Sequence, residues 1–114
     1  MTVIRTPAAL DALWSNRETR FEDMMKIVVD VENGVLAADA ELHADLEAVL
    51  LRDGSKQEHL WGANLYPLLG RENADFIECT ALVNIRPSAG NPGMEIVDPS
   101  VRAAVKSVVL KLLG

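Results

Sequence analysis

The stretch Phe76–Asp98, FIECTALVNIRPSAGNPGMEIVD, decides how the fold is interpreted because it is the longest β-like run in the chain. From Phe76 to Arg86 one set of alternate positions is apolar apart from a thiol: Ile77, Cys79, Ala81, Val83 and Ile85. The intervening positions mix polar and apolar side chains. Successive side chains of a strand point to opposite faces, so this alternation predicts one long strand with a buried face.

The second half of the stretch predicts a return strand. Residues 87–93 contain two Pro and two Gly, which favour a turn and are poorly tolerated within a β-ladder. Met94–Val97 then alternates again. An antiparallel register that keeps the apolar side chains on one face places Asn84 opposite Glu95, with Arg86 diagonal to Glu95.

A second hairpin is predicted around Asn33-Gly34, which separates the β-like runs Met24–Val31 and Val35–Ala38. Asn-Gly is the preferred pair for a two-residue type I′ turn, because both central residues need a positive φ. With that turn Val31 lies opposite Leu36, and the apolar faces of the two strands match.

Helices are predicted near both ends of the chain. Residues 7–19 follow Thr6, which can cap a helix, with Pro7 at its first position. Val101–Leu113 follows Asp98 and Pro99, which serve the same two purposes there. Its last turns are apolar nearly all round, which predicts either deep packing or a contact between two copies of the chain.

The sequence permits more than one structure for the middle of the chain. Asp39–Asp53 fits a helix capped by Asp39 and ended by Gly54, but its alternating leucines also permit a strand. Ser55–Pro67 begins polar and becomes extended, with Gly62 marking a bulge or a close backbone approach. Together these elements predict a single α+β domain over residues 1–114. Its sheet is mainly antiparallel and built from hairpins, with about three helices packed against one face.

Composition bounds the classes of function. The 114 residues carry a net charge of −6, and residues 22–58 hold ten acids against three Lys or Arg. Phosphate-backbone binding needs a basic patch, so nucleic acid is disfavoured. The acidic middle could attract a basic partner or a divalent cation, or serve as a solvated face.

Neither a membrane segment nor a disulfide is indicated by the sequence. No apolar run reaches the roughly 20 residues that span a bilayer, and the N-terminus has no apolar signal segment, which predicts a cytoplasmic protein. The single Cys79 excludes an intramolecular disulfide and fits a small core thiol.

A weak metal-binding pattern is formed by His43 and Glu47, which stand four residues apart and share one side of a helix. A third ligand is needed, for which His59 or Asp30 are candidates. The alternative is an ordinary i,i+4 surface pair.

Two further groups are candidates for binding a small ligand. Residues 53–64 gather Lys56, His59, Trp61 and Asn64, which suits a polar pocket capped by Trp61, although Trp61 also fits a core anchor. In the central stretch Asn84, Arg86 and Glu95 share the mixed face. Arg86 suits an anion, because guanidinium binds carboxylate or phosphate bidentately, or a structural pair with Glu95.

No nucleophile elbow, phosphate-binding loop or dinucleotide-binding fingerprint is present, so no cofactor is predicted.

The segments KIVVDVENGVLA, ELHADLEAVLLRDGSKQEHLWGANLYP and LVNIRPSAGNPGMEIVDPSVR, which fall within residues 25–105, carry a resemblance. The chain resembles a family of small bacterial proteins catalogued only as a domain of unknown function. The resemblance implies kinship and no activity.

The leading hypothesis is therefore a non-catalytic interaction or small-ligand-binding module, self-associating through Val109 and Leu113 of the last helix. The alternative hypothesis is a divalent-metal-dependent hydrolase that uses Asp30, His43 and Glu47.

Overall fold

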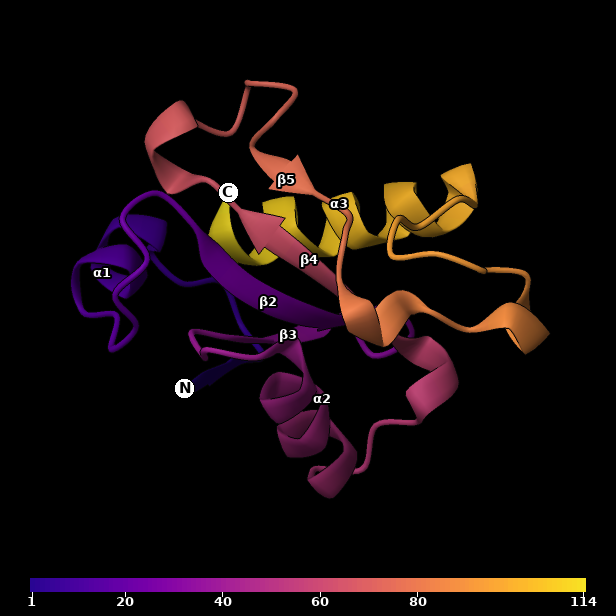
Figure 1. Cartoon of the computed structure of the whole chain (residues 1–114). Coiled ribbons are helices and arrows are strands. Elements are labelled where there is room, and N and C mark those ends of the chain that lie inside the picture. The colour runs from indigo at the N-terminus through magenta and orange to yellow at the C-terminus, as the bar shows by residue number, and fades with distance from the viewer.

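A computed structural model describes residues 1–114 and arranges them around one five-stranded antiparallel sheet (Figure 1). The strands are β1 (Thr2–Ile4), β2 (Met25–Asp30), β3 (Val35–Ala38), β4 (Leu60–Leu65) and β5 (Ile77–Glu78). Their order across the sheet is β1-β3-β2-β4-β5, and every neighbouring pair is antiparallel. The predicted α+β class with a mainly antiparallel sheet is confirmed.

Helices cover both faces of the sheet rather than the single face expected from the sequence. One face packs against α3 (Pro99–Leu113), with α1 (Leu10–Ser15) beside it, and holds the larger apolar core. The other face packs against α2 (His43–Arg52) through a smaller core (Figure 1). The central strands β2 and β3 are consequently apolar and buried on both sides, which explains why their sequences lack a polar alternation.

The hairpin between β2 and β3 forms, but its predicted turn is wrong. Asp30 pairs with Val35, so four residues form the loop instead of two, and Gly34 has a positive φ of 67° while Asn33 does not. The buried Asp30 carboxylate accepts hydrogen bonds from the backbone N–H groups of Glu32 (3.0 Å) and Asn33 (2.9 Å). These hydrogen bonds organise the longer loop, and they override the preference of Asn33-Gly34 for a two-residue turn.

Local sequence signals predict the start of the last helix correctly but not the start of the first. The last helix begins as predicted, with Asp98 accepting a 2.8 Å hydrogen bond from Ser100 N and Pro99 at the first position. The first helix is shorter than predicted and starts at Leu10 without a Thr6 cap.

The apolar end of α3 belongs to the core of the chain. Val109 is 0% and Leu113 2% exposed. Of the two alternatives predicted for this end of the helix, deep packing is the one observed. Val109 and Leu113 are therefore not available as a seam, and any contact between copies through α3 would use its outer side.

Residues 43–52 form a helix and not a strand, which resolves the open alternative for this segment. The helix ends as expected, with Gly54 at a φ of 103° and Ser55 N donating to Leu50 O. The predicted cap does not form. Asp39, at a φ of 74°, accepts a 2.7 Å hydrogen bond from the Thr19 hydroxyl.

The central stretch departs most from its prediction. Only Ile77–Glu78 joins the sheet, and short 3₁₀ turns at Leu82–Asn84 and Pro87–Ala89 replace the long strand. Isolated bridges pair Thr80 with Glu95 and Arg86 with Asn91, so the predicted register is wrong. Residues 79–97 form an excursion beyond β5 (Figure 1).

No helix in the structure has the length and apolar character needed to cross a membrane.

Candidate functional site

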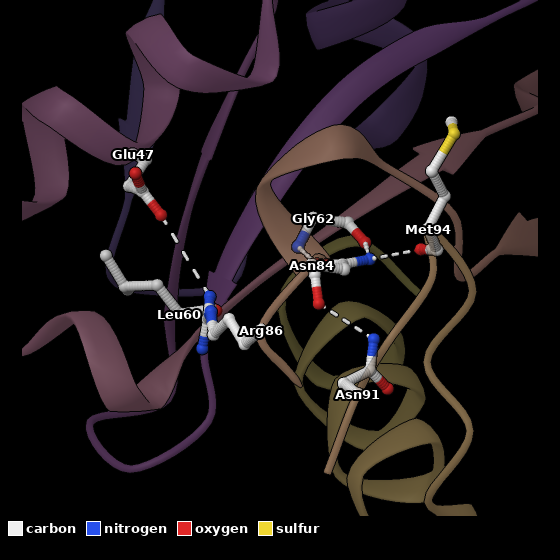
Figure 2. Close-up of polar contacts among 7 residues, drawn as sticks. All are labelled: Glu47, Leu60, Gly62, Asn84, Arg86, Asn91 and Met94. Carbon is white, nitrogen blue, oxygen red and sulfur yellow. Dashed lines mark hydrogen bonds and ion pairs between the residues drawn. The ribbon is translucent and has the colours of Figure 1, made fainter. Parts of the chain in front are cut away.

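The edge of β4 beyond β5 is completed by a side chain in place of a strand. The carboxamide of Asn84 accepts a 2.8 Å hydrogen bond from Gly62 N and donates one of 2.9 Å to Gly62 O, as a neighbouring backbone would (Figure 2). Its Nδ2 also donates to Met94 O at 3.1 Å. A buried sheet edge needs its donors and acceptors satisfied, and Asn84 satisfies this one.

Gly62 permits this approach. A Cβ at this position would lie 2.6 Å from the Cβ of Ala81 and 2.8 Å from Cγ2 of Val83. The close backbone approach predicted for Gly62 is confirmed.

A second asparagine closes the excursion on itself. The buried Asn91 donates from Nδ2 to the carbonyls of Asn84 (2.8 Å), Gly93 (3.0 Å) and Glu95 (3.0 Å). Its Oδ1 accepts from Val97 N at 3.0 Å. Figure 2 shows the carboxamide of Asn91 directed at the Asn84 backbone.

Arg86 is bound within the chain and does not face Glu95. Its guanidinium donates to Leu60 O and has Nη2 4.0 Å from Oε2 of Glu47 (Figure 2). It also lies 4.5 Å from the ring centroid of Trp61. The side chains of Arg86 and Glu47 are only 14% and 15% exposed. Burial lowers the pKa of Arg86, and the Glu47 carboxylate opposes that shift. These contacts give Arg86 a structural role, but the predicted pair with Glu95 is wrong.

The other predicted ligand residues of 53–64 do not converge. Lys56 is exposed, and His59 lies 3.8 Å from Glu58. Trp61 is 7% exposed within the larger core, as the anchor alternative expected. Asn64 instead turns toward Glu78, to which its Nδ2 donates at 2.8 Å.

The metal candidates are each held by other partners. Nε2 of His43 lies 2.9 Å from Ala63 O and donates to it, while the Asp30 carboxylate accepts from the Ser55 hydroxyl at 2.6 Å. Burial opposes ionisation of Asp30, but the hydrogen bonds from Ser55, Asn33 and Glu32 outweigh it and lower the pKa. No group of three or more His, Cys, Asp or Glu side chains is placed to hold a metal ion. The arrangement gives no support to the hydrolase alternative.

The largest of the three main cavities lies between α3, at its N-terminal half, and β5 with the residues that follow it. It has a volume of about 390 Å³, against about 270 and 220 Å³ for the next two. Apolar side chains, among them Ile77 and Ile96, line it together with Arg102 and Lys106 of α3. Glu78 and Glu95 line it as well.

The charged groups of this cavity are not paired with each other. Arg102 and Lys106 stand one turn apart on α3 and form neither an ion pair nor a side-chain hydrogen bond. The Glu95 carboxylate is equally free, whereas Oε1 of Glu78 accepts from Asn64 and, at 3.2 Å, from the Tyr66 hydroxyl. Asp75 also lines the cavity, which thus presents two cations and three carboxylates.

Cys79 and Tyr66 also line the cavity, and both keep their protons at neutral pH. Burial raises the pKa of the Cys79 thiol; Lys106 and Arg102 oppose that shift and Glu78 adds to it. Burial, and then the Glu78 carboxylate, raises the pKa of Tyr66. Tyr66 therefore acts as a hydrogen-bond donor, and Cys79 is a neutral thiol.

Of the ligand and metal candidates named from the sequence, only Glu95 lines this cavity, and Asn64 supports it by binding Glu78. Sequence reasoning missed Arg102 and Lys106. Their i,i+4 spacing on the polar face of the last helix was the available signal. Nothing in the sequence indicated that this face would lie against β5.

Comparison with known protein families gives a match over nearly the whole chain. Residues 2–112 match the model described as Protein of unknown function (DUF5674). The chain belongs to the DUF5674 family. This confirms the resemblance to a family known only as a domain of unknown function. No curated protein and no solved structure matches the sequence of this DUF5674 member.

Proposed function

We propose that this DUF5674 domain is a non-catalytic small-ligand-binding module, and that the cavity between β5 and α3 is its site. One observation carries the proposal: Arg102 and Lys106 line the largest of the three main cavities and have no ionic partner in the chain. They would bind an anionic group of the ligand, such as a carboxylate or phosphate.

The dimensions and chemistry of the cavity support binding. Its volume of about 390 Å³ falls within the roughly 300–1,000 Å³ of small-molecule pockets. Five of its eleven lining residues are charged and five are hydrophobic, which suits a charged ligand with a small apolar part. An ammonium and a guanidinium one helical turn apart can both reach a single anion.

The state of the nearby thiol favours binding over catalysis. A cysteine nucleophile needs a thiolate, which a lowered pKa supplies. The pKa of Cys79 is raised, so the group in the cavity best suited to nucleophilic attack is held in its unreactive form.

Calorimetric titration with acetate, succinate and inorganic phosphate tests the proposal. We expect at least one of these anions to bind, and the double change Arg102→Gln and Lys106→Gln to weaken that binding about tenfold or more. This follows because a hydrogen bond to a charged group contributes about 1.5–3 kcal/mol.

Lys111→Gln is the matched control, since Lys111 is an exposed cation of the same helix that does not line the cavity. The control should bind as the wild type does. The proposal fails if none of the anions binds, or if the double variant and the control bind equally well.

A further inference from the structure

We infer that the ligand of this cavity is a small zwitterion, with a carboxylate bound by Arg102 and Lys106 and an ammonium bound by Glu78 and Glu95. The inference rests on the proposed function and goes further by assigning the opposite end of the ligand. A free amino acid is the simplest molecule with this chemistry.

The cations and the acids come from different segments of the chain. Arg102 and Lys106 belong to α3. Glu78 ends β5, and Glu95 lies in the returning segment of the excursion, where it bridges to Thr80. The lining of the cavity therefore carries both positive and negative charges, and these belong to different elements of the fold.

These opposite charges do not neutralise one another. No nitrogen of Arg102 or Lys106 lies within 4.0 Å of a carboxylate oxygen of Glu78 or Glu95. Cys79 lies on the cavity lining, and Lys106, Arg102 and Glu78 all influence the pKa of its thiol. A ligand that carries both charges can contact both the cations and the acids, whereas a plain anion contacts only the cations.

The acid end is prepared for a donor. Asn64 and the Tyr66 hydroxyl both donate to Oε1 of Glu78, at 2.8 and 3.2 Å, and leave its Oε2 free to accept. The carboxylate of Glu95 has no partner in the chain. A primary ammonium has three donors and can bind two carboxylates at once. Fixing Glu78 before the ligand arrives reduces the entropy lost on binding.

The remaining lining suits the carbon skeleton of such a ligand. Leu69, Ile77 and Ile96 contribute apolar surface to the same cavity. The volume of about 390 Å³ accommodates one small molecule and excludes a folded partner.

The test is calorimetric titration of the full chain with the twenty L-amino acids, followed by two derivatives of the tightest binder. One derivative is N-acetylated and has lost the positive charge; the other is the decarboxylated amine and has lost the negative charge. We expect each derivative to bind at least tenfold more weakly than the parent amino acid.

Variants assign the two ends. Glu95→Gln should weaken binding of the amino acid about tenfold and leave binding of the N-acetyl derivative unchanged, because only the parent amino acid carries the ammonium. Glu58→Gln is the control, an exposed acid outside the cavity, and should change neither. Glu95 is itself exposed, and circular dichroism checks that its variant folds.

The outcomes separate this inference from the proposed function. If acetate or phosphate binds through Arg102 and Lys106 but no amino acid binds more tightly than acetate does, the zwitterion is rejected and anion binding stands. Equal affinity for the amino acid and its N-acetyl derivative also rejects the zwitterion, without relying on any variant. If neither the simple anions nor any amino acid binds, both the inference and the proposed function fail.

Discussion

Replacing Asn84 by Ala tests whether its carboxamide completes the edge of β4. The side chain is fully buried and forms three hydrogen bonds, two with Gly62 and one with Met94 O. Alanine would leave the N–H and C=O of Gly62, itself buried, without partners. The Met94 carbonyl keeps a partner, because it also accepts a 3.1 Å hydrogen bond from Ala81 N.

The expected cost follows from these two backbone groups. A buried donor or acceptor left unsatisfied costs about 1–3 kcal/mol, so Asn84→Ala should lose about 3–4 kcal/mol of unfolding free energy. That is a large share of the roughly 5–15 kcal/mol of a typical domain. At about 4 °C or more per kcal/mol, the melting temperature should fall by at least about 12 °C.

Urea unfolding followed by tryptophan fluorescence measures this cost, since Trp61 lies in the core near the affected edge. Asn73→Ala is the matched control, because Asn73 is exposed and its side chain accepts only one hydrogen bond, from Asp75 N. It should cost less than about 1 kcal/mol. If Asn84→Ala loses no more than this control, the carboxamide is not what completes the edge, and the reasoning is refuted.

Three further predictions concern the core, the last helix and pH. Gly62→Ala should cost about 1–3 kcal/mol because its Cβ would meet that of Ala81 at 2.6 Å, whereas Gly93→Ala, in open space, should unfold in urea like wild type. Val109→Lys should unfold the chain, because it places a charge at a buried position, and circular dichroism would detect the loss of structure. A folded monomer would contradict this. Burial lowers the pKa of His43 below 6.5, so its stabilisation is present above about pH 6.5 and lost below it. Urea midpoints of His43→Gln should therefore fall less than those of wild type between about pH 7 and pH 5, and parallel curves would contradict the assignment.

Local rules predicted those elements whose determinants lie within a few residues. Asp98 and Pro99 fix the start of α3 through one capping bond and a preset φ, and no distant contact opposes them. The β2–β3 pairing was likewise visible in two apolar runs. Its loop was not, because Ser55, twenty-five residues along the chain, helps to hold the Asp30 carboxylate that organises it.

The prediction for the central stretch was wrong for a related reason. Its alternation fits a strand from Phe76 to Arg86, yet a strand is stable only where a neighbouring backbone accepts its ladder. Beyond Glu78 the edge of β4 is occupied by the side chain of Asn84. A buried asparagine in an alternating run looks like a solvent-facing polar position, and periodicity cannot distinguish the two.

The candidate site was inaccessible to sequence reasoning because it depends on α3 lying against β5. Arg102 and Lys106 stand more than twenty residues from Glu78, and only the fold relates them. Arg86, the most conspicuous cation of the central stretch, was a weaker guide. An arginine can satisfy a buried carbonyl and an aromatic face as readily as a ligand, and here it contacts Leu60 O and Trp61.

The asparagine bonds at the edge of β4 also bear on the proposed site. Asn91 donates to Glu95 O and accepts from Val97 N, so it holds the backbone on both sides of Ile96, which lines the cavity beside Glu95. Asn91 is in turn tied to Asn84 O, and Asn84 to Gly62 of β4. The position of Glu95 relative to α3 therefore depends on a chain of buried hydrogen bonds that begins in the sheet. A single long strand ending in a tight hairpin, as the alternation predicted, would have paired Glu95 with Asn84 and turned it away from Thr80, which now lines the cavity with it. The departure from regular strand structure is what brings this carboxylate to the cavity.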